Sequence, residues 1–168
     1  MTREEWDQSS DATAMLRVLY VQQSKHLRKQ LKQVHHFLIA CSWKHVHLIP
    51  QESIREGLKG GEKWIAGEID NEELNRLNYH AEGEAFFLDY CNKPEDIRRI
   101  EAWIAGIKQL NGMSFEAARD VLKRAAYFAE GSMIYPTLPP GPWIGGLFKS
   151  EFLFPDLLRE HLTPNLAD

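Results

Sequence analysis

Residues 25–48 read KHLRKQLKQVHHFLIACSWKHVHL, and this stretch decides the fold that we predict for the chain. Apolar side chains recur in it at alternating steps of four and three residues, the spacing of one face of an α-helix. That face is formed by Leu27, Leu31, Val34, Leu38, Cys41 and His45. The pattern predicts a long central helix, with Ser24 as its N-cap and Pro50 just beyond its end.

Cap residues and the same periodicity predict further helices on both sides of this stretch. Thr2–Glu5 and Asp70–Glu73 have the spacing of capping boxes, and Asp11 and Ser114 are typical N-caps. Two short helices are expected to begin near residues 3 and 12. Four longer ones should span 51–66, 70–88, 94–112 and 114–131, and a last short helix should span 155–161. No convincing strand alternation is found. We therefore predict an all-α fold, a single-domain bundle of about seven helices plus a short C-terminal helix.

The bulk properties predict one soluble, cytoplasmic domain covering residues 1–168. This length suits a single domain with its own core. The first residues lack the apolar run of a signal peptide, and no run of 18 apolar residues predicts a membrane span. Two cysteines, Cys41 and Cys91, are too few for a disulfide scaffold, and a net charge of −4 selects no class of partner.

The helical pattern ends after Gly131. Residues 133–146, MIYPTLPPGPWIGG, contain four prolines and two consecutive glycines, which exclude a regular helix. The chain therefore divides into a helical body (1–131), a Pro/Gly-rich segment (132–150) and a short helix with a tail (151–168).

Aromatic side chains beside prolines are typical of protein interfaces, so we predict a contact surface in residues 135–154. Its candidate residues are Tyr135, Trp143, Phe148, Phe152 and Phe154. The alternative is that this segment covers one open end of the bundle and completes its core.

Charge is distributed unevenly along the chain. No Asp or Glu occurs between Ala12 and Gln51, a span with six Lys or Arg and five of the seven His, whereas residues 52–101 carry a net charge of about −6. One hypothesis is a helix at 25–47 that binds nucleic acid or another anion. Its candidate residues are Lys25, Arg28, Lys29 and Lys32. The alternative, a solvated or internally packed face, is favoured because no nucleic-acid-binding motif is present.

Few patterns point to chemistry. Cys41 and His45 lie four residues apart on one helix face, the spacing of paired metal ligands, but no CxxC or HExxH motif accompanies them. The sequence therefore predicts no metal, and it has no P-loop, dinucleotide fingerprint or nucleophile elbow that would predict a cofactor or a catalytic centre. An enzyme stays a third hypothesis, which would need a deep pocket lined by His80 and a nearby carboxylate.

The leading hypothesis is a non-catalytic protein-interaction module that binds an unknown protein partner or itself and does not bind a membrane. Three stretches add a resemblance to a known family: MTREEW…D…AMLRVL at the start, HFLIACSWKHVHLIP at 36–50 and GEKWIAGEIDNEEL at 61–74. They resemble a family of uncharacterised bacterial proteins, abundant in planctomycetes, that open with an MTEAEW…PMLEFL pattern. The late LLREHLTP at 157–164 is similar to the family's LLRDIFGNPFRP.

The resemblance implies a helical fold and an origin in a bacterial cytosol. It implies no activity and supplies no catalytic residues. One departure from the family is that the several cysteines of the family's second motif are reduced here to Cys41.

Overall fold

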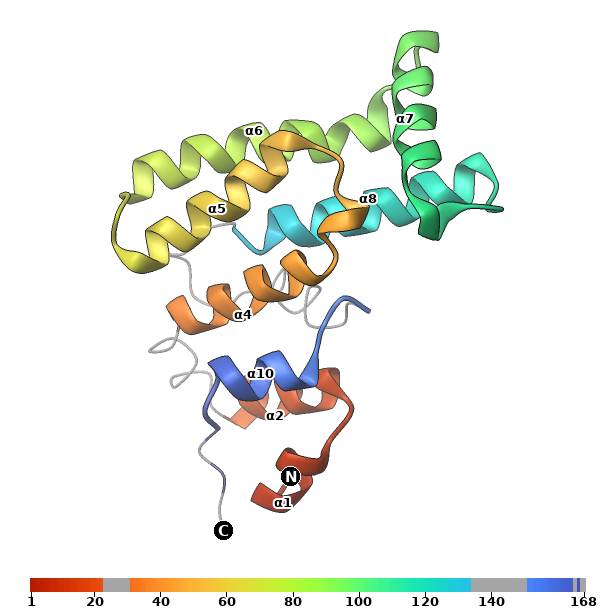
Figure 1. Cartoon of the computed structure of the whole chain (residues 1–168). Helices are drawn as coiled ribbons and strands as arrows, with labels where there is room; N and C mark the ends of the chain where they lie inside the picture. Colours follow the sequence, from red (N-terminus) through yellow and green to blue (C-terminus); the bar gives the residue numbers. More distant parts are fainter. Residues whose placement is uncertain (23–30, 134–150, 165, 167–168) are drawn as a thin grey trace.

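The computed structural model describes residues 1–22, 31–133, 151–164 and 166, and these residues form eight α-helices and no β-strand (Figure 1). The all-α prediction is confirmed. The helices are α1 (Arg3–Gln8), α2 (Ala12–Gln22), α4 (Leu31–Lys44), α5 (Glu52–Ala66), α6 (Asn71–Tyr90), α7 (Pro94–Gly106), α8 (Phe115–Gly131) and α10 (Pro155–His161). Two 3₁₀ turns, Val46–Leu48 and Lys108–Leu110, follow α4 and α7.

Most of the predicted caps form. Thr2 and Glu5 make a complete capping box, with the Thr2 N–H donating to the Glu5 carboxylate over 2.7 Å. Asp70 accepts from the Glu73 N–H over 2.9 Å, but the Glu73 carboxylate pairs with Arg76 instead of completing the box.

Two predicted boundaries are wrong by several residues. The helix expected over 25–48 ends at Lys44 as α4, and its predicted first residues, 25–30, lie outside the described part of the chain. The helix expected over 94–112 ends at Gly106 as α7. In both cases a 3₁₀ turn follows, so apolar residues continue the helical spacing after the α-helix has stopped.

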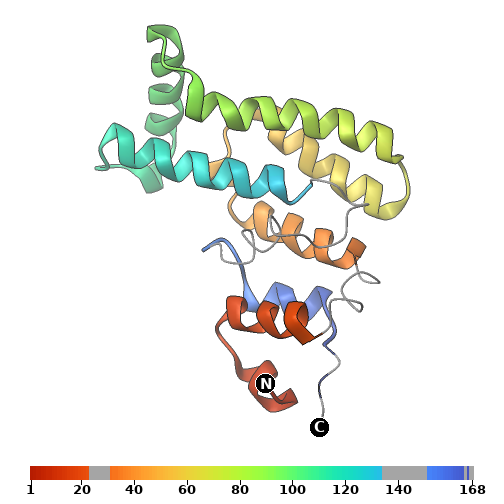
Figure 2. The same cartoon turned by 180° about the vertical axis from the view of Figure 1, so that it is seen from behind.

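The helices stack in three levels (Figure 1, Figure 2). α5, α6 and α8 form one level, α4 lies against it, and α2 and α10 pack on the far side of α4, with α1 beyond them. α7 stands across the ends of α6 and α8. One continuous core runs through these levels and includes Trp6, Leu16, Phe37, Leu58, Leu122 and Leu158.

The glycines of α5 allow the closest contacts in this stack. Gly57, Gly60 and Gly61 are buried. A Cβ atom at Gly61 would lie 2.6 Å from Cδ1 of Ile39 on α4, and one at Gly57 would lie 2.8 Å from the Met133 sulfur. Gly67, with a φ of +79°, ends α5 in the left-handed conformation, so that α6 folds back along α5.

We expect Gly61→Leu to lower the free energy of unfolding by about 1–3 kcal/mol, because the new side chain must displace Ile39 in a packed core. Urea unfolding measures this. Gly106→Leu is the matched control, because a Cβ atom at Gly106, the last residue of α7, meets nothing within 4 Å. The control should leave stability unchanged or raise it by up to about 1 kcal/mol through helix propensity. Equal effects at the two positions would contradict the proposed role of Gly61.

Candidate functional site on the outer face of α6

The described aromatic residues of the predicted 135–154 surface lie against the core. Phe152 is only 5% exposed, and its ring centroid lies 5.5 Å from that of Phe128 and 4.7 Å from that of His45. The Phe154 ring stacks on His45, with 5.2 Å between the ring centroids. These two residues therefore complete the core beside α4. The other candidates, Tyr135, Trp143 and Phe148, lie outside the described residues.

Lys32, the one described residue of the predicted anion-binding set, contacts α5. Its Nζ lies 4.9 Å from the centroid of the Trp64 ring and donates to the Ile65 carbonyl over 3.5 Å. A lysine in this place complements the carbonyl end of the α5 dipole. Lys25, Arg28 and Lys29 lie outside the described residues.

Cys41 is buried, and His45 is partly buried against the rings of Phe152 and Phe154. Burial raises the pKa of the Cys41 thiol to about 12, opposed by a smaller effect of its hydrogen bond to the Phe154 backbone. Burial also lowers the pKa of His45, and His47 lowers it further. In the part of the chain that the structure describes, no three His, Cys, Asp or Glu side chains are grouped as metal binding requires.

Two buried polar groups near the end of α8 were missed by the sequence analysis. Glu130 is 6% exposed, and its Oε1 has no hydrogen-bond partner. Burial raises its pKa to about 7, helped by the nearby Glu82 and opposed by a hydrogen bond with Asn78. His35 is 2% exposed, and its Nδ1 lies 2.8 Å from the Ser132 carbonyl oxygen.

A sequence signal for Glu130 existed, because it lies four residues after Ala126, on the apolar side of the predicted helix. The Glu130 carboxyl takes up a proton near neutral pH. It touches neither of the two surface hollows described on α5 and α6.

We expect the stability of the chain to fall as Glu130 ionises. Its pKa is about 7 in the folded chain and about 4.5 in the unfolded chain, so the folded state holds the proton more tightly. Below pH 4.5 the tighter proton binding of folded Glu130 contributes fully to the free energy of unfolding. This contribution, about 3 kcal/mol, is lost as the pH rises from 4.5 to about 7.

Urea unfolding of the wild type and of Glu130→Gln, measured from pH 4 to pH 8, tests this. The variant should be the more stable protein at pH 8. The lowered pKa values of His35 and His45 change stability with pH in the opposite direction. Both proteins share this effect, so subtracting one stability curve from the other removes it. Parallel curves would contradict the shifted pKa.

The outer face of α6 carries the largest exposed aromatic side chains among the described residues. Tyr79 is 73% exposed, Tyr90 75% and Phe86 41%. The core side of the helix is formed by Leu74, Ala81, Ala85 and Leu88. Residues 79, 83, 86 and 90 lie within about 60° of one another on a helical wheel, because the helix turns about 100° per residue. They form a single stripe opposite the core, which we call the α6 aromatic face.

Gly83 makes a notch in this face. A Cβ atom added there would meet nothing within 4 Å. A hollow of about 410 Å³ opens around it, lined by Tyr79, His80, Glu82, Gly83, Glu84 and Phe86. All six residues come from α6, so the hollow is an open depression in one helix surface. It is not the deep pocket beside His80 that the enzyme hypothesis requires.

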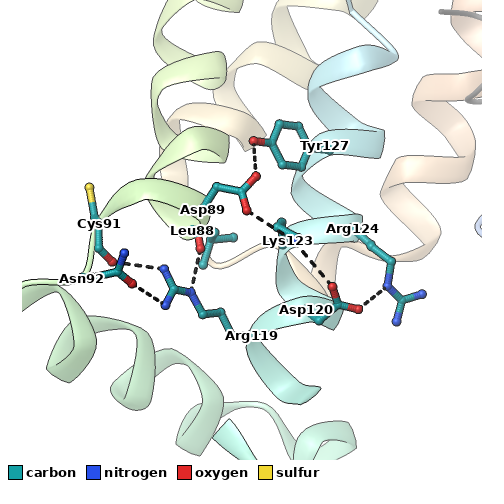
Figure 3. Close-up of polar contacts among 9 residues, drawn as sticks. All are labelled: Leu88, Asp89, Cys91, Asn92, Arg119, Asp120, Lys123, Arg124 and Tyr127. Carbon is teal, nitrogen blue, oxygen red and sulfur yellow. Dashed lines mark hydrogen bonds and ion pairs between the residues drawn. The ribbon is translucent and has the colours of Figure 1, made fainter. Parts of the chain in front are cut away.

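Polar contacts from α8 fix the end of α6 that carries Phe86 and Tyr90 (Figure 3). Arg119 donates to the carbonyl oxygens of Leu88 and Cys91 over 2.7 and 3.1 Å, and to the Asn92 side chain over 2.8 Å. These carbonyls have no partner within α6, because the helix stops there. Arg119 thus supplies the hydrogen-bond donors that a further helical turn would have provided.

A second contact supports the aromatic face from its side. The Tyr127 hydroxyl donates to Asp89 over 2.8 Å, and Lys123 lies 3.3 Å from the same carboxylate. The Tyr127 hydrogen bond lowers the pKa of Asp89, and Lys123 lowers it further. The Tyr127 ring lies 5.8 Å from that of Phe86. α8 therefore contacts one side of the Phe86 ring, and the ring's outer side stays exposed.

Sequence analysis did not single out this face. A signal was present, because Tyr79, Phe86 and Tyr90 repeat at intervals of seven and four residues.

Comparison with protein-family models, curated proteins and solved structures finds no match to this chain. The resemblance to the planctomycete family therefore stays a prediction. In the described part of the chain, no helix has both the length and the apolar composition needed to cross a membrane.

We expect Arg119→Met to lower the free energy of unfolding by about 1–3 kcal/mol, because it leaves partly buried carbonyls without a donor. Arg124→Met, five residues further along α8, is the control, because the contacts of Arg124 with other described residues are surface ion pairs with Asp120 and Glu151. Its effect should stay below about 1 kcal/mol. Thermal unfolding of both variants gives the comparison, and equal losses would show that Arg119 does not brace α6.

Proposed function

We propose that this chain is a protein-interaction module and that the α6 aromatic face is its contact surface. The observation that carries the proposal is the exposure of Tyr79, Phe86 and Tyr90 in one stripe. Single exposed apolar residues are ordinary in soluble proteins, whereas grouped ones mark interaction sites. Tyrosine is also among the residues that contribute most to binding at the centre of interfaces.

The setting of the face also supports this role. Large rings with few rotatable bonds lose little entropy when a partner covers them. The helix beneath them is held at one end by the Asp70 cap and at the other by Arg119. Exposed polar residues, Asn75 and Arg76, border the stripe, as a polar rim borders the apolar centre of an interface.

The partner that fits this face is another α-helix. Its four residues are spaced at intervals of four, three and four, the spacing at which side chains of one helix enter the gaps of another. The notch at Gly83 accepts one large side chain between Tyr79 and Phe86.

Photo-crosslinking in cells of the natural host tests the proposal. A benzophenone amino acid at position 79 or 90 of the full chain should form covalent adducts with a polypeptide. The same group at Glu4, an exposed residue of α1, should form few. Adding Phe86→Lys should reduce the adducts at position 79 about tenfold, because a buried lysine at the centre of an apolar contact is costly. Equal labelling from positions 79 and 4 would refute the contact surface.

A further inference from the structure

We propose that the helix that covers the α6 aromatic face is α6 of a second copy of this chain, packed antiparallel about a twofold axis. This inference rests on the proposed function and names its partner. It is carried by the order of residues along the stripe, by the notch at Gly83 and by the area of exposed ring surface.

The spacing of the stripe is the same in both directions. From Tyr79 to Gly83 is four residues, from Gly83 to Phe86 three, and from Phe86 to Tyr90 four. In a twofold interface each residue meets the residue at the mirrored position in the other copy. For an axis between residues 84 and 85, Tyr79 meets Tyr90 of the other copy and Gly83 meets Phe86.

This register places a large side chain over the only gap in the stripe. The Phe86 ring of each copy enters the notch left by Gly83 of the other, so both notches are filled. A parallel pair in register would place Phe86 against Phe86 and Gly83 against Gly83, which separates the helices at one point and leaves a void at the other. Packing without voids therefore favours the antiparallel pair.

Neighbouring helices contact α6 beside the stripe. α7 contacts α6 through Phe87, whose ring lies 5.7 Å from that of Trp103, and through Glu84, which pairs with Arg99. These two residues lie on the side of α6 next to the stripe and not on it. α8 supports Phe86 from the opposite side through Tyr127. Between these contacts the three aromatic residues of the stripe stay exposed.

The exposed area is enough for a weak dimer. With about 200 Å² for a whole aromatic side chain, the exposed fractions leave about 380 Å² of ring surface on each copy. Both copies together could therefore bury at most about 760 Å² of ring surface, to which the rim residues Asn75, Arg76 and Glu82 add. An interface of this size belongs to the weak, transient class, so we expect a reversible dimer with a Kd on the order of micromolar to millimolar.

Sedimentation equilibrium of the purified full chain between about 1 μM and 1 mM tests the dimer. The wild type should pass from monomer to dimer over this range. Gly83→Gln should raise the Kd at least tenfold, because its side chain fills the notch, while glutamine favours the helix more than glycine does. Met113→Gln, which changes a residue that is 47% exposed elsewhere, should leave the Kd unchanged. Circular dichroism confirms that each variant is folded.

Disulfide trapping tests the direction of the pair. In a Cys91→Ser background, chains with Tyr79→Cys mixed with chains with Tyr90→Cys should form a mixed disulfide. Tyr79→Cys alone should not, because its two copies lie about 16 Å apart along the paired helices at 1.5 Å per residue. The buried Cys41 remains as an internal control.

The outcomes separate this inference from the proposed function. A wild type that stays monomeric at 1 mM, or a disulfide between two Tyr79→Cys chains, would overturn the antiparallel dimer. If the crosslinking at positions 79 and 90 then gave adducts with a different polypeptide, the contact surface would stand and its partner would be another protein. Adducts of twice the mass of the chain, together with the mixed disulfide, would support the second copy.

Discussion

The close contact of α5 with its neighbours is the constraint on which the rest of the bundle depends. Without side chains at Gly57, Gly60 and Gly61, α5 approaches α4 and α6 until backbone and side-chain ends touch. This contact covers part of the inner side of α6, with Ala81 placed against Gly57, and α8 covers another part of it. The opposite side of α6, which carries the aromatic stripe, therefore faces outward. The position of the candidate site thus follows from glycines on another helix.

α8 holds this arrangement through polar groups of two kinds. At its start Arg119 satisfies the carbonyls at the end of α6, which stabilises the helix at the place where the aromatic face ends. At the end of α8, Glu130 is buried beside Asn78 and Glu82 of α6, where its negative charge is poorly solvated. One helix therefore contributes a stabilising contact at one end of α6 and a pH-sensitive one further along it.

The two aromatic-rich parts of the chain have opposite roles. Phe152 and Phe154 enclose His45 and bring the C-terminal segment against α4, so their rings stabilise the fold. Tyr79, Phe86 and Tyr90 leave most of their area open, and their removal would cost the folded monomer little. Composition alone does not distinguish these cases, because both segments are rich in aromatic residues. The difference is which side of each element meets another element.

The sequence by itself determined the helices and most of their starts, because caps and periodicity act within a few residues of one another: Thr2 caps with Glu5, and Asp70 with Glu73. It did not determine where α4 and α7 stop, since a 3₁₀ turn keeps nearly the same apolar spacing. Only the tertiary structure decided that Glu130 is buried, that Phe152 belongs to the core and that Tyr79 is exposed. Burial depends on contacts between residues distant in sequence, as between Phe128 and Phe152, and no local pattern specifies which helix face such a contact will cover.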